Sequence, residues 1–500
     1  MELFDNLLLG FSVALQWNNL LYCLIGALIG TMIGVLPGIG PIPTVALLLP
    51  FTFGMAPASG FIMLAGIFYG AQYGSSTTAI LVNIPGETSS VITCLDGHQM
   101  AKQGRAGTAL AIAALSSFMA GCVATVVIAL LSGPLSRLAM NFTAVEFFSL
   151  MILGLIAAVI LAQGSVVKSL SMVVLGLLLG IVGIDVNSGA ARMTFNIPEC
   201  ADGLSFVSVS MGFFGLAEII KNLERPEPRV VVSQKLKDLF PSWKDLKTAF
   251  PAAVRGTCIG SIMGVLPGGG AALPPFTAYA IEKKIAKDPS RFGKGAIEGV
   301  ASPEAANNAG AQTSFIPLLT MGIPSNALMA LMIGALMIHG IQPGPQIMVE
   351  QRDMVWAVIV SMWIGNVMLL VINLPLIGMW VSLLKVPYRL LFPAILLFCC
   401  VGAYGASNSV ADVWLMLGCA VVGYFFIKVK VETAPLLLGL VLGPQIEENL
   451  RRALLISDGD FSVFVTRPIS AFLLGTVVVI LVVLLSPAVL KKRQEIVESD

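Results

Sequence analysis

The stretch that decides the fold of this chain is Gly34-Val35-Leu36-Pro37-Gly38-Ile39-Gly40, which returns 230 positions later as Gly264-Val265-Leu266-Pro267-Gly268-Gly269-Gly270. Both GVLPG copies interrupt strongly apolar sequence. Proline and glycine release backbone groups from helical hydrogen bonding, and lipid cannot satisfy those groups. Helices that break at matching places in two halves of a membrane protein are the best sequence pointer to a transport site. We therefore expect bound ligand or ion near these two breaks.

The composition sets the broad class of the protein. The 500 residues are 57% hydrophobic and only 11% charged, and the mean hydropathy is +0.90, far from the soluble norm. A net charge of +1 with no separate basic domain argues against nucleic acid as a partner. No Walker A motif, nucleophilic triad or CxxC pair is visible, so we expect no enzyme activity, no cofactor and no metal cluster. The start of the chain lacks the basic region of a cleaved signal peptide, so we expect its first helices to be retained.

The apolar stretches predict an all-α polytopic membrane protein with about 11–12 transmembrane segments embedded in a lipid bilayer. One long polar linker, with three prolines, divides the chain at 221–247. Two stretches, 60–95 and 296–338, are too long for one crossing, so each is expected to hold a helix and an unwound or re-entrant piece. The expected segments are 19–53 (broken), 60–95, 107–131, 143–163, 170–186, 203–221, 252–281 (broken), 296–338, 354–381, 390–405, 410–427, 432–446 and 468–489.

The repeat extends beyond the GVLPG segments. Gly70-Ala71-Gln72 matches Gly310-Ala311-Gln312, and Asn83-Ile84-Pro85 matches Gly322-Ile323-Pro324, in the same order. This order predicts an internal duplication. We expect a first membrane repeat at 1–221, a cytoplasmic linker at 222–250, a second repeat at 251–446, and an extra transmembrane helix with a cytoplasmic tail at 447–500.

Basic residues favour the cytoplasmic side of a membrane, and their positions give an orientation. If each GVLPG segment forms a hairpin, the lysine-rich flanks of the second hairpin are cytoplasmic and the first hairpin faces outside. The two repeats are then inverted, with a periplasmic N-terminus and a cytoplasmic C-terminus. This assignment places every lysine inside and leaves only these arginines outside: Arg137, Arg192, Arg352, Arg451, Arg452 and Arg467.

The glycines of the breaks are the first candidate site residues. Half-helices that meet inside the membrane present free N–H groups to a carboxylate and free carbonyls to a cation. The alternative is a turn or hinge beside the site without ligand contact, and the sequence leaves both open. The candidates are Gly38, Gly40, Gly268 and Gly270.

A polar run follows each break. In the first half, four consecutive hydroxyl residues and an asparagine could replace water around a carboxylate or bind sodium, although Ser and Thr often bond only their own helix. In the second half, adjacent asparagines are costly in hydrocarbon unless they are paired. The candidates are Ser75, Ser76, Thr77, Thr78 and Asn83 in the first run and Asn307, Asn308, Gln312, Thr313, Ser314, Ser325 and Asn326 in the second.

Two carboxylates stand nearest these runs, Glu87 and Glu304. Intramembrane carboxylates are functional candidates as cation ligands or proton carriers, although either residue could instead lie at the membrane boundary or cap a helix. We take both as coupling candidates, with Na⁺ as a coupling ion near the same residues.

Together, the first GVLPG segment, the run from Tyr73 to Glu87, the Gly104–Gly107 turn, Pro303–Ala309 and Gly322-Ile323-Pro324 resemble the large membrane subunit of tripartite tricarboxylate transporters, TctA type. The resemblance spans residues 20 to about 445. Two departures are Gly269-Gly270-Ala271-Ala272, which is richer in glycine than its first-half partner, and His98, where the family often has tyrosine.

The resemblance implies a bacterial inner-membrane permease that works with a small membrane subunit (TctB type) and a periplasmic solute-binding protein (TctC type). It implies uptake of citrate, other tricarboxylates or related carboxylates, driven by a Na⁺ or H⁺ gradient. By looser analogy with other broken-helix transporters we expect an elevator-like motion. A stand-alone anion channel is the alternative, and a homodimer is left open.

Overall fold

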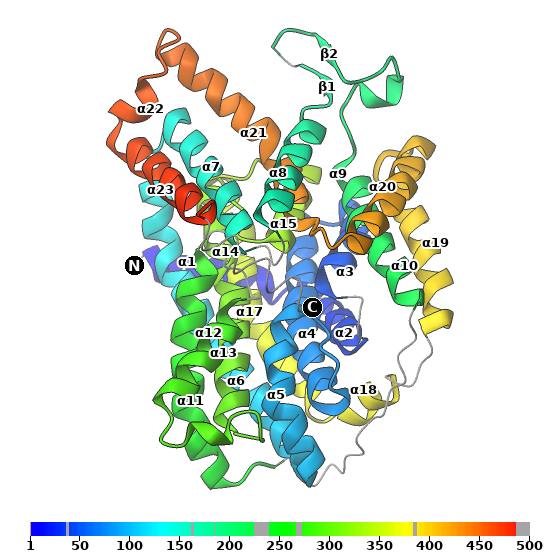
Figure 1. The fold of residues 1–500 in the computed structure, drawn as a ribbon, viewed down its shortest axis with the longest axis vertical. Helices are drawn as coiled ribbons and strands as arrows, with labels where there is room; N and C mark the ends of the chain where they lie inside the picture. Colours follow the sequence, from blue (N-terminus) through cyan, green and yellow to red (C-terminus); the bar gives the residue numbers. More distant parts are fainter. Residues whose placement is uncertain are drawn as a thin grey trace.

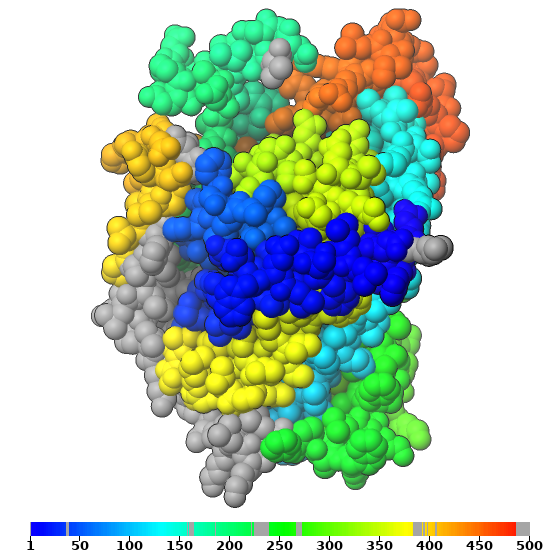
Figure 2. All heavy atoms as spheres, turned by 180° about the vertical axis from the view of Figure 1, so that it is seen from behind, coloured from blue at the N-terminus to red at the C-terminus, as the bar shows by residue number. Residues whose placement is uncertain are grey.

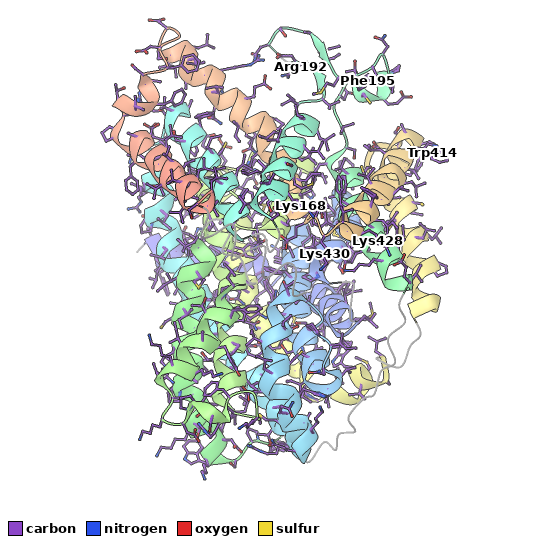
Figure 3. All side chains as sticks on the ribbon, viewed as in Figure 1. Lys168, Arg192, Phe195, Trp414, Lys428 and Lys430 are labelled. Atoms are coloured by element: carbon purple, nitrogen blue, oxygen red, sulfur yellow. The ribbon has the colours of Figure 1, made fainter. Side chains whose placement is uncertain are left out.

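The computed structural model describes residues 2–36, 40–161, 165–185, 187–224, 240–266, 273–383 and 388–486. Within these residues the chain is almost entirely helical, as expected (Figure 1). Two short antiparallel strands, β1 (Gly183–Ile184) and β2 (Ala191–Arg192), form a hairpin at one end of the molecule. Figure 3 places Arg192 and Phe195 at this end.

The linker at 221–247 divides the helices into two halves. Those of the first half are α1 (Glu2–Ala14), α2 (Trp17–Val35), α3 (Pro41–Leu48), α4 (Pro57–Val82), α5 (Val91–Met100), α6 (Ala106–Ala139), α7 (Ala144–Leu161), α8 (Val166–Gly180), α9 (Phe206–Ser210) and α10 (Ala217–Glu224). Those that follow are α11 (Trp243–Val265), α12 (Leu273–Ile285), α13 (Glu298–Thr313), α14 (Phe315–Met321), α15 (Ala327–Ile338), α16 (Ile347–Glu350), α17 (Arg352–Asn373), α18 (Ile377–Leu383), α19 (Tyr388–Ser407), α20 (Val410–Lys428), α21 (Ala434–Ile456), α22 (Val463–Thr466) and α23 (Pro468–Leu484). Short 3₁₀ and π segments join several of them, at η1 (Leu49–Gly54), η2 (Thr88–Ser90), η3 (Ala101–Arg105), η4 (Pro198–Cys200), η5 (Met211–Leu216) and η7 (Pro289–Arg291).

Among the described residues, four helical runs are long and apolar enough to cross a membrane, namely Trp17–Val35, Thr88–Ala139, Arg352–Asn373 and Val410–Lys428. Shorter apolar helices accompany them at Pro41–Gly54, Ala144–Ala157, Val166–Gly180, Ala327–Ile338 and Pro468–Leu484. The multi-pass character is therefore supported, and the expected number of crossings stays a prediction.

Both long polar-run segments are broken where the Ile-Pro pairs stand. Helix α4 ends at Asn83, whose φ of 60° lies in the left-handed region, and the chain resumes as η2 and α5. Helix α14 ends at Gly322 with a φ of 70°, and the chain resumes as α15. The first GVLPG segment is broken as well, because α2 ends at Val35 and Gly40, with a φ of 66°, precedes α3.

Close contact between α2 and α4 depends on glycine. Gly26, Gly30 and Gly34 recur every fourth residue on α2 and face the backbone of α4. A Cβ atom at Gly30 would lie 2.3 Å from the carbonyl oxygen of Ile67, which no side chain could accommodate. Small residues at this spacing let two membrane helices approach closely, and here they hold α2, the helix before the first break, against α4.

The second half repeats this arrangement with α11 and α13. Gly256, Gly260 and Gly264 face α13, and a Cβ at Gly260 would lie 2.3 Å from the carbonyl oxygen of Ala306. Gly30 and Gly260 are separated by the same 230 positions as the GVLPG copies. The predicted duplication thus has a direct counterpart in helix packing.

The packing also shows which residues of α4 and α13 occupy equivalent positions in the two halves. A Cβ at Gly34 would meet Ala71 O, and a Cβ at Gly264 would meet Gly310 O, so Ala71 corresponds to Gly310. This is an offset of 239, which also relates Asn83 to Gly322. The register differs by one residue from the sequence match of Ala71 with Ala311, because that match compared residue types and not helix faces.

Helices α4, α5, α6 and α13 contact one another in the interior, and α17 covers α4 and α6. A second group is formed by α7, α8, α21 and α23, which Figure 1 shows toward the end that carries the strands. Figure 2 shows the molecule from behind, with the N-terminal segment in dark blue across this face. There Gly10 of α1 lies against the backbone of Trp356 in α17.

Candidate functional site

The Glu304 carboxylate lies at the meeting point of both halves of the chain. It belongs to α13, is 1% exposed, and accepts hydrogen bonds from side chains of three first-half helices. Ser76 Oγ of α4 donates to Oε2 at 2.6 Å, Thr93 Oγ1 of α5 donates to Oε1, and Ser117 Oγ of α6 lies 3.4 Å from Oε2. The carboxylate is therefore surrounded by hydroxyl groups.

Asn308 extends this cluster by one helical turn of α13. Its Nδ2 donates to Ser117 Oγ at 2.7 Å and to the backbone carbonyl of Glu304 at 3.1 Å. Its Oδ1 is buried and has no hydrogen-bond partner among the described residues. Ser76, Thr93, Ser117, Glu304 and Asn308 are called the Glu304 cluster below.

A second carboxylate, Glu87, lies at the Ile-Pro break after α4. Gln72 Nε2 lies 3.4 Å from its Oε2, and Ser89 donates to its Oε1. Glu87 also forms a capping box with Ser90 at the start of η2, as the alternative of a helix cap predicts. Asn307 lies beside this carboxylate, but neither of its side-chain polar atoms has a hydrogen-bond partner in the described part of the chain.

In the described part of the chain, neither carboxylate has a basic partner. None of the ion pairs within the described ranges involves Glu87 or Glu304. A buried charge without a counter-charge is expensive in a low-dielectric interior, and hydrogen bonds offset only part of the cost. The arrangement thus fits a site that takes up a cation.

Unpartnered amide atoms gather on the same face of α13. They belong to Asn307, Asn308 and Gln312, each no more than 1% exposed. Within the described residues both polar atoms of the Asn307 side chain, Asn308 Oδ1 and Gln312 Nε2 lack a partner, whereas Gln312 Oε1 accepts from Thr125 at 2.9 Å and Asn308 Nδ2 is bonded as described above. Buried polar atoms are nearly always satisfied, so a concentration of exceptions marks a place where a ligand, an ion or water completes the structure.

A small cavity adjoins the Glu304 cluster. It reaches Ser76 and Ser117 of the cluster, and the predicted site residue Thr77 lines it as well. Its other lining residues are Tyr73, Leu110, Ala113, Ala114, Asn373, Leu374 and Ile377. Glu304 does not line this space itself, but two of the lining hydroxyls, those of Ser76 and Ser117, bond its carboxylate.

Several other predicted site residues use their side chains for local structure. Thr78 Oγ1 donates to Val35 O at 2.8 Å and so satisfies a carbonyl left free where α2 ends. Asn326 accepts from Met329 N and caps α15, and Asn83 is exposed in its left-handed position. The remaining hydroxyls bond nearby backbone carbonyls: Ser75 bonds Gln72, Thr313 bonds Ala309, Ser314 bonds Ala311 and Ser325 bonds Ser314.

Of the candidate glycines, Gly40 needs its positive φ rather than space, since the nearest atom to a Cβ there would be 4.0 Å away. Gly38, Gly268 and Gly270 lie outside the described residues. Their proposed contact with ligand stays a prediction.

Sequence reasoning missed Thr93 and Ser117, whose hydroxyls complete the Glu304 cluster. It also missed the role of Asp96 on α5. Asp96 is fully buried, and its Oδ1 accepts from three backbone N–H groups, those of Gly293, Gly295 and Ala296, at 2.7–2.9 Å. This contact clamps the loop before α13 onto α5. The one available signal was a lone aspartate next to glycine in a weakly polar stretch.

These features define a helical membrane protein in which two broken-helix units share one buried polar cluster. Among the described residues no group of three His, Cys, Asp or Glu side chains could hold a metal ion in the usual way. The chain belongs to the tripartite tricarboxylate transporter TctA family, whose sequence profile matches residues 20–438. The resemblance noted from the motifs is thereby confirmed.

Two relatives from Agrobacterium vitis are similar to the chain. One, named "Uncharacterized 52.8 kDa protein in TAR-I ttuC' 3'region", is 52% identical over 501 residues and covers the whole of both chains. The other, named "Uncharacterized protein in TAR-II ttuC' 3'region", is 53% identical over 241 residues, which is 48% of this chain and all of the relative. No solved structure matches the chain.

Proposed function

We propose that this chain is the permease subunit of a binding-protein-dependent secondary transporter that imports tricarboxylates or related carboxylates across the bacterial inner membrane. The family supports the substrate class and two partners, a small TctB-type membrane subunit and a periplasmic TctC-type solute-binding protein. The single observation that carries ion coupling is the buried Glu304 carboxylate, enclosed by hydroxyls and without a basic partner in the described residues.

Ion coupling is expected from the charge at Glu304. An ionised carboxylate in this position is stable only when a cation or a proton neutralises it. A carboxylate substrate carries further negative charge into the same region. Na⁺ or H⁺ binding before the substrate therefore lowers the cost of bringing the substrate in, and this is the thermodynamic basis of symport.

Contacts between loops support the proposed orientation, with the N-terminus outside and the C-terminus inside. Lys168 Nζ donates to Val429 O at 2.7 Å, and Gln103 Nε2 donates to Lys294 O at 2.8 Å. Each contact joins two segments that the distribution of lysines assigns to the cytoplasmic side. Figure 3 shows Lys168, Lys428 and Lys430 in one region of the molecule.

Contacts among residues assigned to the periplasmic side also agree with the proposed orientation. Arg192 forms a two-pronged pair with Glu447 at 2.8 and 2.9 Å, and Arg451 bonds Asp185, so the hairpin and the end of α21 share one cluster. The hydrogen bonds from Arg451 hold the pKa of Asp185 well below its usual range. Arg352 also bonds Asn6 near the N-terminus. Each contact joins residues that the charge argument assigns to the same side.

We further propose that the two repeats are inverted and that transport is elevator-like. Helix α3 follows the first GVLPG break and contacts η5, and α15 follows the second Ile-Pro break and contacts α21. Sliding at these contacts would move the polar cluster relative to η5 and α21. Disulfide crosslinks that fix α3 to η5 or α15 to α21 should stop uptake, and unchanged uptake in the crosslinked protein would remove the elevator from the proposal.

The proposed function is tested in proteoliposomes that contain the chain and its small membrane subunit. Uptake of labelled carboxylate should exceed equilibrium only when both an inward ion gradient and the purified binding protein are present. Vesicles with collapsed gradients are the control. Uptake that only runs downhill, with no need for the gradient, would favour the anion channel and contradict the proposal.

A further inference from the structure

We infer that the Glu304 cluster is a sodium site, with the Glu304 carboxylate, the hydroxyls of Ser76, Thr93 and Ser117, and the Asn308 carbonyl as its oxygen donors. The inference rests on the proposed function only in taking the chain as ion-coupled. It goes further by choosing between the two coupling ions and by naming donors from both halves.

The donor set has the chemistry that a hard cation requires. Carboxylate, hydroxyl and amide carbonyl oxygens are the ligands that hard cations prefer over nitrogen and sulfur. The cluster offers one negative charge, which a monovalent ion neutralises completely, whereas a divalent ion would leave one positive charge buried. The described residues place no second carboxylate in hydrogen-bond contact with these donors.

The hydroxyl groups can turn their lone pairs toward an ion. Ser76 Oγ has a second acceptor, the carbonyl oxygen of Gln72 at 3.1 Å, so its proton can bond its own helix while its oxygen faces the site. Asn308 is already oriented in this way. Its Nδ2 is used by Ser117 and by its own helix, which leaves Oδ1 as a buried acceptor without a donor.

This orphaned oxygen distinguishes sodium from a proton. Protonation of Glu304 removes the buried charge, and the new O–H group can donate to Ser76 Oγ once the Ser76 proton turns to Gln72 O, but Asn308 Oδ1 remains unsatisfied. A sodium ion removes the charge and also gives Asn308 Oδ1 a partner. One ion thus accounts for both irregularities of the cluster.

The proposed sodium site also joins helices from the two halves of the chain. Ser76, Thr93 and Ser117 come from α4, α5 and α6, whereas Glu304 and Asn308 come from α13 of the second half. An ion bound by all of them ties the two halves together. Sodium should therefore stabilise the folded protein even in the absence of substrate and partners.

The experiment uses the purified full-length chain in detergent, without substrate or binding protein. Thermal stability and ²²Na⁺ binding are measured while NaCl replaces choline chloride at constant ionic strength and constant pH, with KCl as the comparison salt. The wild type should show saturable sodium binding and a rise in melting temperature. Thr93→Val, which removes one hydroxyl at nearly constant volume, should weaken sodium binding about tenfold. Glu304→Gln should abolish it.

Thr320→Val is the matched control. Thr320 is equally buried, but its hydroxyl bonds only the carbonyl of Ile316 in its own helix, so sodium binding should be unchanged. If Glu304→Gln does not fold, Thr93→Val and Ser117→Ala still test the site. Absence of sodium-specific binding in the wild type, or normal binding in both hydroxyl variants, would overturn the inference. Uptake that is driven by protons alone would overturn it too, while leaving the proposed transport function intact.

Discussion

The two halves of this chain, each with one GVLPG segment, have similar helix packing but carry different side chains. In both halves a glycine-lined helix lies against a second helix at the same spacing, with Gly30 facing Ile67 and Gly260 facing Ala306. In both, the following break begins with a left-handed residue, Asn83 in one and Gly322 in the other. The helix packing is therefore alike in the two halves.

The chemistry of the two halves is not equivalent. In the register fixed by helix packing, Glu304 corresponds to Ala65 and Asn308 to Tyr69, so the first half has no equivalent carboxylate or amide there. The first half instead contributes the hydroxyls of Ser76, Thr93 and Ser117. The comparison indicates one shared asymmetric site rather than two copies of a site.

The largest expected effect is a loss of stability when the glycine contacts common to both halves are disrupted. Gly30→Leu and Gly260→Leu should each destabilise the protein by more than about 3 kcal/mol, because the new side chain would overlap the backbone of the facing helix. Little monodisperse protein should be recovered by size-exclusion chromatography. Gly418→Leu, at a site with no neighbour within 4 Å, is the control. Normal recovery of either Gly30 or Gly260 variant would show that the two helix pairs are not packed alike.

The next effect concerns a contact between the two halves. The Asp96 carboxylate of α5 clamps the loop before α13. Asp96→Asn should lower the stability by about 2 kcal/mol, since charge-assisted hydrogen bonds to three backbone N–H groups lose their charge. The melting temperature in detergent measures this loss. Asp202→Asn, in an exposed loop, should leave the melting temperature unchanged, and an equal shift for both variants would argue against the clamp.

A smaller effect distinguishes the hydroxyls of the two polar runs. Ser76→Ala should lower the initial rate of uptake about tenfold at subsaturating ion concentration, because it removes a donor from the Glu304 cluster. Ser314→Ala should change the rate less than about twofold, because Ser314 bonds only the carbonyl of Ala311. The ratio of the two rates is the measurement. A ratio near one would mean that the runs act alike.

The smallest effect is expected at Asn83, the residue with a positive φ at the end of α4. Asn83→Gly should leave uptake unchanged and alter stability by no more than about 1 kcal/mol, since glycine adopts a positive φ without strain. Asn83→Val should lower the melting temperature clearly, because a β-branched residue is strained in this region. A strong loss of uptake in Asn83→Gly would restore Asn83 to the ligand site, from which its exposed position separates it here.

Much of this plan could be predicted from the sequence. Proline and glycine in apolar surroundings have few structural solutions, so the first GVLPG break and both Ile-Pro breaks were predictable. Glu304 and Asn308 were recognisable because carboxylates and amides are costly in a membrane. Ser76 was one of four adjacent hydroxyls, and only the fold separates it from Thr78, which satisfies the end of α2.

The rest required the three-dimensional arrangement. Thr93 and Ser117 are isolated hydroxyls in apolar stretches, where a bond to their own helix is the ordinary expectation. Their convergence on Glu304 depends on how α5 and α6 cross α13, and no local pattern records that crossing. Asp96 was missed for the same reason, since its partners, three backbone N–H groups and the Tyr279 hydroxyl, lie 183 to 200 positions away.

The central claim is that Glu304 couples the ion gradient to carboxylate movement. It is tested most directly by comparing wild type and Glu304→Gln in proteoliposomes, with accumulation against a gradient and exchange of labelled for unlabelled substrate measured in parallel. We expect Glu304→Gln to lose accumulation but to keep exchange, because a neutral side chain needs no ion for the substrate to enter. Accumulation at the wild-type level in Glu304→Gln would contradict the claim.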